Sequence, residues 1–379
     1  MRAVHGLRRT EFPWTAETTY LNNASIGPLP ERTRRVLDDF SAMRAEPHLL
    51  PDTSLMGGLA EARVTVSRLL NADVDEVALA TNTSYGLNVA ALSLPLEAGE
   101  TVLVSDKEFP ANVYPWLMLQ EQGVVVELAP TTPKGWPNED LILERLRDPG
   151  VRVLAVSFVQ FASGYRADLA RLSEACQANG TYLVVDAIQG LGQCPLDVRE
   201  TRIDMLACGA QKWLLSPWGS GFLYVRRALI ANLRPCVAGW LAFEGTDDFT
   251  RLTDYDATFR SDARRFELAT LPFQDLVGMT ESIGLLLDVG IEQICTYLKE
   301  VRRPLRDAAE AGILQLASPV DPVHESSIVC VQTPHVEESY NALKKAGVVC
   351  VMREGSIRLS PHIYNTVEEI ERVVDILEG

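Results

Sequence analysis

The chain has 379 residues, of which 47% are hydrophobic and 23% are charged, a composition typical of a folded globular protein. Its formal net charge is −16, because 51 Asp and Glu outnumber 35 Lys and Arg. This balance lacks the basic footprint of a nucleic-acid binder or of a protein that binds anionic membranes, so we expect neither partner.

Cysteine and histidine spacing argues against a disulfide framework and against a metal site. The seven cysteines are scattered without a Cys-x-x-Cys pair, and the five histidines form no short-spaced cluster. The first residues do not resemble a signal peptide, and no apolar run approaches the roughly 18 residues of a membrane-spanning helix. We therefore expect a cytoplasmic protein with reduced thiols.

Short apolar runs alternate with amphipathic segments through the first two thirds of the chain. A short strand begins near Thr19, and a helix begins near Pro30. Repeated β-then-α units predict a mainly parallel, seven-stranded sheet flanked by helices. The expected strands span residues 77–80, 101–105, 124–128, 151–158, 182–186, 205–208 and 222–225, with helices at 139–147 and 167–179, the latter stopped by Gly180.

The alternation ends at about residue 251, and the remaining pattern predicts a smaller α+β domain. A helical stretch begins near residue 273 and continues beyond 301. Strands follow at 326–332, 348–352 and 356–360, with helices between them. We divide the chain into an N-terminal segment (1–18), a large domain (19–255) and a small domain (256–379), against which the N-terminal segment can also pack.

Three polar side chains follow expected strands of the large domain. Asp186 closes a buried strand, Gln189 follows it, and Lys212 lies among apolar and small residues after the next strand. A lysine that forms an imine needs such a sheltered site, and a buried aspartate needs a cation. Ligands of parallel sheets bind at the carboxyl ends of the strands, so one crevice can hold all three. The plainer alternatives are a lysine that caps a loop and an aspartate that caps a helix.

Four further segments accompany this group in a consistent order, at residues 83–88, 108–116, 265–270 and 357–366. Together with them, residues 20–374 resemble the class V aminotransferase family of pyridoxal-phosphate (PLP) enzymes of fold type I. That family also contains cysteine desulfurases, kynureninase-like hydrolases and isopenicillin-N-epimerase-like proteins. The resemblance implies that Lys212 is the Schiff-base lysine and the general base at the substrate Cα. It also implies that Asp186 pairs with the pyridine nitrogen and Gln189 with the phenolic oxygen of PLP.

The resemblance also implies a site for the cofactor phosphate. Thr83 and Ser84 match the family's phosphate loop, where backbone N–H groups at a helix start would face the anion. Gln211 stands where the family often has a phosphate-binding histidine, and Thr270 matches a residue that reaches the phosphate of a neighbouring subunit. A homodimer is therefore expected. Taken alone, a Thr-Ser pair before a helix is only an N-cap.

The remaining matches concern the cofactor ring and the amino-acid substrate. Phe109 aligns with the residue that stacks on the pyridine ring, and Arg358 aligns with the arginine that binds the substrate α-carboxylate. Asn23 and Ala24 are expected near the substrate. Without the family context, Phe109 is a packing residue and Arg358 a strand-end arginine in a surface salt bridge.

The reaction is narrowed by what the chain lacks. Desulfurases carry a nucleophilic cysteine on a loop between the counterparts of Arg353 and Arg358, but here only a short link joins these two residues. We favour an aminotransferase acting on an amino acid. A PLP-dependent C–S lyase or an amino-acid epimerase is the alternative, and a PLP-fold binding protein without turnover is a third reading, which the retained Lys212, Asp186 and Arg358 disfavour.

Overall fold

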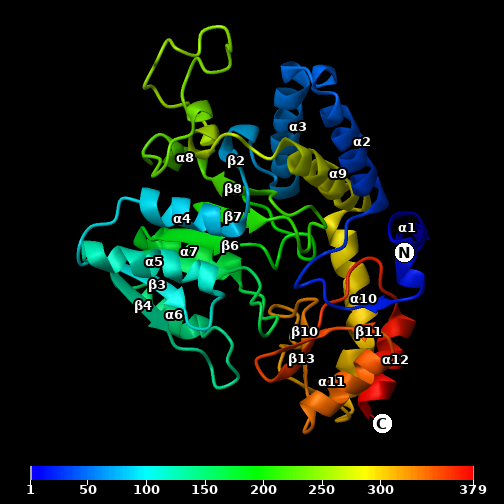
Figure 1. The fold of residues 1–379 in the computed structure, drawn as a ribbon. Helices are drawn as coiled ribbons and strands as arrows, with labels where there is room; N and C mark the ends of the chain where they lie inside the picture. Colours follow the sequence, from blue (N-terminus) through cyan, green and yellow to red (C-terminus); the bar gives the residue numbers. More distant parts are fainter. Residues whose placement is uncertain (1, 379) are drawn as a thin grey trace.

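The computed structural model describes residues 2–378 and contains a central seven-stranded sheet (Figure 1). The expected and observed strands agree to within about a residue at most ends. The strands are β2 (Val77–Ala80), β3 (Thr101–Ser105), β4 (Val125–Ala129), β5 (Val151–Ser157), β6 (Tyr182–Asp186), β7 (Met205–Gly209) and β8 (Gly221–Val225).

The sheet has the order β2-β8-β7-β6-β5-β3-β4. Pairing is parallel from β7 through β6, β5 and β3 to β4, whereas β8 is antiparallel to both β7 and β2. The predicted mainly parallel sheet is therefore confirmed. Because β8 alone runs in the opposite direction, the carboxyl ends of the other six strands lie at one edge of the sheet.

Both faces of the sheet are buried, which explains why the strands are continuously apolar. In β6, Leu183 and Val185 contribute to one hydrophobic core, and Val184 contributes to the other. The core of Val184 contains residues from α4 (Thr83–Ser93) and α5 (Tyr114–Leu117). The opposite core contains residues from α3 (Asp52–Leu70), α6 (Glu139–Arg145), α7 (Leu169–Asn179), α9 (Phe273–Val289) and α10 (Ile291–Glu310).

Several helix ends differ from the sequence prediction. The single helix expected from about residue 273 is divided at Gly290, whose φ of 90° ends α9 before α10 begins. Helix α7 begins at Leu169 because the Asp168 side chain accepts a hydrogen bond from the Arg171 N–H as its N-cap. We did not predict α1 (Arg2–Glu11) or α3, while α2 (Glu31–Ala45) begins where expected.

The C-terminal part forms a second, antiparallel sheet with the order β12-β13-β10-β9. The apolar stretch 348–352 forms two short strands instead of one. The elements are β9 (Gln315–Leu316), β10 (Val329–Gln332), α11 (Val336–Lys345), β11 (Val348–Val349), β12 (Val351–Arg353), β13 (Ser356–Leu359) and α12 (Val367–Glu378); α8 (Arg227–Ile230) belongs to the first part.

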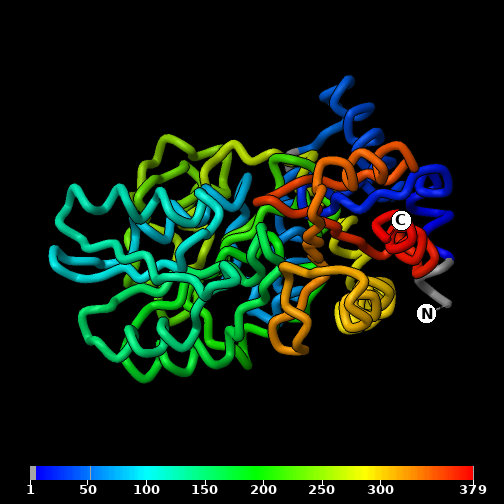
Figure 2. Tube along the Cα trace, turned by 90° about the horizontal axis from the view of Figure 1, so that it is seen from below, coloured from blue at the N-terminus to red at the C-terminus, as the bar shows by residue number. Residues whose placement is uncertain are grey.

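The N-terminal segment crosses to the C-terminal part of the chain. Strand β1 (Thr19–Tyr20) pairs in parallel with β11, and the Arg8 guanidinium contacts Glu369 of α12. Figure 2 shows the blue start of the chain beside its orange and red end, away from the cyan and green sheet. The domain boundaries themselves stay a prediction.

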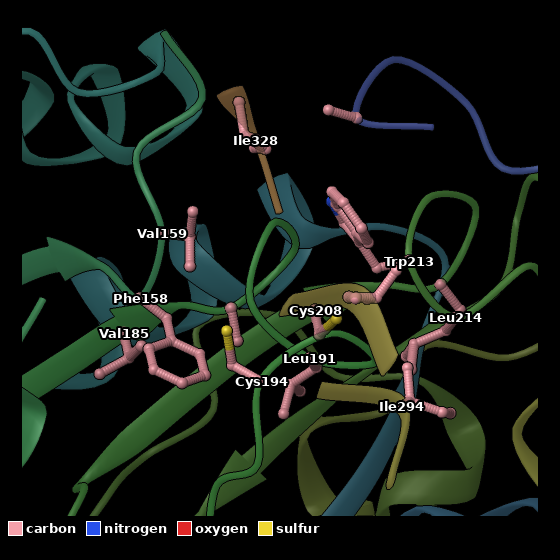
Figure 3. Packing of buried hydrophobic residues seen from close by; sticks show 14 of the residues in the cluster. Phe158, Val159, Val185, Leu191, Cys194, Cys208, Trp213, Leu214, Ile294 and Ile328 are labelled. Atoms are coloured by element: carbon pink, nitrogen blue, oxygen red, sulfur yellow. The ribbon is translucent and has the colours of Figure 1, made fainter. Parts of the chain in front are cut away.

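A buried core supports the loop that follows β7. Trp213 and Leu214 are 1% exposed and belong to the same core as Ile294 of α10 and Ile328, which precedes β10 (Figure 3). The Ser282 hydroxyl of α9 donates to the Leu215 carbonyl at 2.8 Å. The loop beyond Lys212 is thus held by both parts of the molecule.

No described helix is both long and apolar enough to cross a membrane. Each of the seven cysteines is a free thiol. Among the side chains that the structure describes, no group of three or more from His, Cys, Asp and Glu is arranged to hold a metal ion.

Candidate active site

Two neighbouring strands deliver the central charged pair. Asp186 is the last residue of β6 and lies in register with Ala207 of β7 and Ser157 of β5. After β7, the chain turns back toward the sheet edge, so Lys212 follows at the carboxyl end of the neighbouring strand. The crevice predicted from strand order therefore does bring Lys212 and Asp186 into electrostatic contact.

The Lys212 side chain is largely withdrawn from water. Burial lowers the pKa of Lys212 to about 8, with Asp186 opposing this shift and Arg358 adding to it. The Nζ atom lies 5.6 Å from the centre of the Phe109 ring. A neutral amine is therefore far more accessible here than on an exposed lysine, and the side chain is not a surface residue that caps a loop.

Asp186 is buried, with 2% of its surface exposed. Burial raises the pKa of its carboxyl to about 6, opposed by a hydrogen bond from the Ile188 N–H and by Lys212. The Ile188 N–H donates to Oδ1 at 3.0 Å and closes a turn. No helix starts here, so Asp186 is not a helix N-cap. The carboxylate thus carries a desolvation cost that a bound cation would relieve.

A second group of residues gathers at the start of α4. Asn82, rather than Thr83, caps the helix by accepting from the Tyr85 N–H at 2.9 Å. The buried Thr83 hydroxyl accepts from the Gly209 N–H at 2.8 Å and keeps its own proton available. A Cβ at Gly209 would lie 2.6 Å from the Gln211 amide oxygen and 3.2 Å from Thr83 Oγ1. Thr83 and Gln211 therefore meet at Gly209, beside the exposed Ser84.

Gln189 is held by protein partners on both sides of its amide. Its Nε2 donates to the Ala24 carbonyl at 3.0 Å, and its Oε1 accepts from the Trp213 indole at 2.8 Å. One Nε2 hydrogen is left for another acceptor. Ala24 and the fully buried Asn23 lie on the same segment, and Asn23 Nδ2 has no recorded partner within the described chain.

Arg358 is buried and forms no salt bridge with a described residue. The alternative of a strand-end arginine in a surface salt bridge therefore does not hold. Its Nη1 donates to the Phe161 carbonyl and its Nη2 to Ser25 Oγ, both at 2.8 Å, while Nε finds no acceptor among the described residues. Burial lowers the pKa of Arg358 to about 10, so the guanidinium stays charged at neutral pH. An unpaired buried cation with a free donor is suited to bind a carboxylate.

The segment before Thr270 is pinned firmly to the large sheet. Glu267 forms a buried two-pronged ion pair with Arg63 of α3, with N–O distances of 2.9 and 2.6 Å, and also accepts from the Leu79 N–H. Thr270 itself is exposed, and no recorded hydrogen bond joins it to Thr83 or Gln211 within the described chain. Its predicted contact with a neighbouring subunit stays a prediction.

The sequence interpretation missed a hydrogen-bonded cluster beside Phe109. The buried carboxylate of Glu108 accepts from the N–H and hydroxyl of Ser157 and from the Gln160 amide. Phe161 packs edge-on against Phe109, with the ring centres 5.3 Å apart. The available signal was an acidic residue in the loop after a strand, next to an aromatic residue.

The hairpin that carries Arg358 has no room for a mobile loop. Strands β12 and β13 are joined by Glu354 and Gly355, whose φ values of 45° and 75° form a two-residue turn. Cys330 lies opposite Arg358 in the sheet, but its thiol is buried and donates to the Ala162 carbonyl. Burial raises the pKa of the Cys330 thiol to about 11, so it is a poor nucleophile.

These residues fit PLP in three respects. A sheltered amine lies within the electrostatic reach of a buried carboxylate that needs a cation. A helix start with a free hydroxyl proton at Thr83 is suited to a phosphate. An exposed aromatic face, Phe109, lies beside the amine.

Comparison with known proteins identifies the family of the chain. Residues 19–373 match the family described as "Aminotransferase class-V". The "Uncharacterized aminotransferase YcbU" of Bacillus subtilis is 31% identical over 371 residues, covering 97% of this chain and 95% of that protein. A "Probable cysteine desulfurase" of Pyrococcus abyssi is 26% identical over 98% of this chain and 96% of its own length.

Solved structures agree on the fold. The cysteine desulfurase CsdA of Escherichia coli superposes with a TM-score of 0.84 at 23% identity, covering 99% of this chain and 97% of that one. A variant of the protein C-DES, with glycine covalently linked to its PLP cofactor, superposes with a TM-score of 0.87 at 19% identity, covering 98% and 99%. The chain therefore belongs to the class V aminotransferase family of PLP-dependent enzymes.

Proposed function

We propose that this protein holds PLP on Lys212 and acts at the Cα of an amino acid, as an aminotransferase. The observation that carries the proposal is the electrostatic pairing of the partly buried Lys212 with the buried Asp186, with Arg358 near enough to lower the pKa of the same lysine. When bound, the cofactor supplies an electron sink for the electrons of a broken bond at Cα.

Each residue of the pair has a defined task. Lys212 would hold the cofactor through its neutral amine and would remove and return a proton at the substrate Cα. Asp186 pairs with the ring nitrogen and keeps it protonated. Phe109 covers one ring face, and Gln189 donates its remaining amide hydrogen to the phenolic oxygen.

The two ends of the site orient the cofactor and the substrate. Thr83, Ser84 and Gln211 hold the phosphate with hydroxyl, amide and backbone donors at the start of α4. Arg358 binds the α-carboxylate of the substrate by exchanging the Phe161 carbonyl and Ser25 hydroxyl for it. Asn23 and Ala24 line the substrate side.

A homodimer is part of this proposal. Thr270 is exposed and is preceded by a segment that the Arg63–Glu267 ion pair fixes on the sheet. This combination suits a residue that reaches the cofactor phosphate of a neighbouring subunit. A cytoplasmic location also stays part of the proposal.

A lyase is the second candidate, and the short β12–β13 turn favours one kind of it. The turn carries no cysteine, so sulfur transfer to a loop thiol is disfavoured. Elimination at Cβ, as in a C–S lyase, needs only Lys212 and the cofactor. Epimerisation by proton return to the other face of Cα also uses this machinery.

The test is spectroscopic and chemical. Purified protein incubated with PLP should absorb at about 410–430 nm, the range of a lysine-bound cofactor. Borohydride reduction followed by peptide mapping should place the label on Lys212. A protein that stays colourless with added PLP would overturn the proposal. Screening amino acids then separates the reactions, because transamination leaves pyridoxamine phosphate and a keto acid, whereas a lyase releases pyruvate without an acceptor.

A further inference from the structure

Glu108 is a buried carboxylate that the proposed chemistry does not use. It is 6% exposed and immediately precedes Phe109. It stands in the loop after β3, and its three hydrogen-bond donors come from the end of β5 and the loop beyond. Because β3 and β5 are adjacent in the sheet, the two loops leave the same edge side by side.

The hydrogen bonds of Glu108 connect the loop after β3 both to the end of β5 and to the loop that follows β5. The Ser157 N–H donates to Oε1 at 2.8 Å, and the Ser157 hydroxyl donates to Oε2. The Gln160 side-chain amide also donates to Oε1, at 2.8 Å. The first two bonds fix Glu108 to the strand end, and the third fixes it to the loop that continues into Phe161.

The same two loops carry the aromatic pair that faces the lysine. Phe109 follows Glu108 directly, Phe161 follows Gln160 directly, and the two rings meet edge to face at 5.3 Å. The Lys212 Nζ atom lies on the Phe109 ring side at 5.6 Å. The Phe109 ring is 44% exposed, so packing alone does not set its position.

Glu108 also lies within electrostatic reach of Asp186. Burial raises the pKa of Glu108 to about 7, opposed by the Ser157 hydrogen bonds and reinforced by Asp186. Ser157 separates the two carboxyls, since it is the register partner of Asp186 in the neighbouring strand. Its backbone and hydroxyl both serve Glu108, which leaves Asp186 unengaged by this cluster.

From this geometry we propose that Glu108 is a positioning residue for the cofactor: its carboxyl clamps the Phe109 loop to the Phe161 loop and thereby sets the aromatic face that covers the PLP ring. The proposal rests on the proposed function, because it assumes that PLP stands between Phe109 and the sheet edge. It assigns Glu108 no contact with the reacting atoms.

The experiment compares the PLP-loaded wild type with two variants of this residue. Glu108→Ala removes all three bonds, whereas Glu108→Gln keeps an oxygen for Ser157 N–H and Gln160 and offers an amide hydrogen to the Ser157 hydroxyl. The readouts are the dissociation constant for PLP, the induced circular dichroism of the bound cofactor and the melting temperature.

We expect Glu108→Ala to weaken PLP binding about tenfold, the effect of roughly 1.4 kcal/mol of lost positioning, and to reduce the induced dichroism. Glu108→Gln should restore most of both signals. Gln160→Ala removes only the hydrogen bond to the loop that carries Phe161. It should change PLP binding and the induced dichroism in the same direction as Glu108→Ala, but by less.

The matched control is Glu76→Ala. Glu76 is likewise buried and accepts backbone N–H bonds, from Asp73 and Arg227, but it precedes β2 at the opposite edge of the sheet. It should lower the melting temperature without changing the dichroism.

The outcomes separate the two proposals. If the wild type binds no PLP, the proposed function fails. If the wild type binds PLP but Glu108→Ala lowers only the melting temperature, as Glu76→Ala does, the positioning role is overturned and Glu108 is purely structural. Unchanged behaviour of both Glu108→Ala and Gln160→Ala would also overturn it.

Discussion

The two ends of the candidate site are built by different physical means. At the phosphate end, Thr83 and Gln211 meet through a backbone hydrogen bond and a close approach at Gly209, next to a segment locked by the buried Arg63–Glu267 ion pair. At the carboxylate end, Arg358 has no ionic partner among the described residues and bonds only to the Phe161 carbonyl and the Ser25 hydroxyl.

This difference indicates which charged residues of the site stabilise the fold and which serve binding. Charges at the phosphate end are already satisfied within the chain, so removing one should mainly affect folding. The charge at the carboxylate end is kept unsatisfied at a desolvation cost, so removing it should mainly affect binding. Lys212 lies between the two ends and resembles Arg358. Desolvation lowers the pKa of its amine, and no described residue accepts a hydrogen bond from that amine.

The largest expected effect is on turnover. Replacing Lys212 by alanine should reduce kcat by at least roughly a thousandfold, because in the proposed function this residue holds the cofactor and moves the Cα proton. Its melting temperature should change little, because Asp186, whose pKa burial already raises to about 6, can take up a proton once the lysine is gone. Steady-state kinetics and a thermal melt test this, with exposed Lys345→Ala as the control. Normal turnover would refute the assignment of Lys212.

The next effect should appear in stability at the phosphate end. Glu267→Ala leaves Arg63 buried and unpaired, which should lower the free energy of unfolding by about 3–5 kcal/mol. The control is Glu127→Ala, which breaks the half-exposed pair with Arg145 and should cost less than about 1 kcal/mol. Urea denaturation measures both. Equal losses would contradict the contrast between buried and exposed pairs.

At the carboxylate end, the expected effect is on substrate binding. Arg358→Ala should raise KM for an amino acid by roughly 10- to 100-fold, because a charge-assisted pair with the carboxylate is lost. Stability should change little or improve. Comparing the amino acid with the corresponding amine, which lacks the carboxylate, gives the control: the variant should no longer discriminate between them. Unchanged KM would remove Arg358 from the site.

The smallest expected effect is on the pH dependence of PLP attachment to Lys212, which Arg358 influences. Since the pKa of Lys212 is lowered to about 8, the neutral amine fraction rises with pH, reaches one half at about pH 8 and approaches its maximum only above that pH. The rate of covalent PLP attachment to the cofactor-free protein should follow this curve. Arg358 lowers the pKa of Lys212, so Arg358→Ala should move the midpoint to higher pH. If the midpoint does not move, Arg358 does not influence the pKa of Lys212, and the two residues do not share one site.

Much of the fold was predictable because local patterns carry it. Strand β6 was predicted at its observed ends, and the alternation of strands and helices sufficed for a mainly parallel sheet. Helix α3 was missed, since Gly57 and Gly58 within it weaken the local helical signal, and its packing against α9 and β2 supplies stability that the sequence does not show. The antiparallel direction of β8 could not be predicted, because local pattern does not specify how the chain returns along β7.

The candidate site divides in the same way. Lys212 and Asp186 could be singled out because each follows an apolar strand, and strand ends of a parallel sheet share one edge. The Glu108 cluster could not be, because its partners lie about 50 residues away and meet it only through the adjacency of β3 and β5. The hydrogen-bond acceptors of Arg358 were equally hidden, since Ser25 and Phe161 lie far from it in the chain.

By itself, the amino-acid sequence determined the strand and helix alternation, the charged pair at the strand ends and the absence of a cysteine between Arg353 and Arg358, because these depend on neighbours in the chain. Only the tertiary structure decided the pKa shifts of Lys212 and Asp186, the unpaired state of Arg358 and the clamp at Glu108. The physical reason is that burial and hydrogen-bond partners are properties of contacts between distant segments, which exist only once the sheet has brought its loops to one edge.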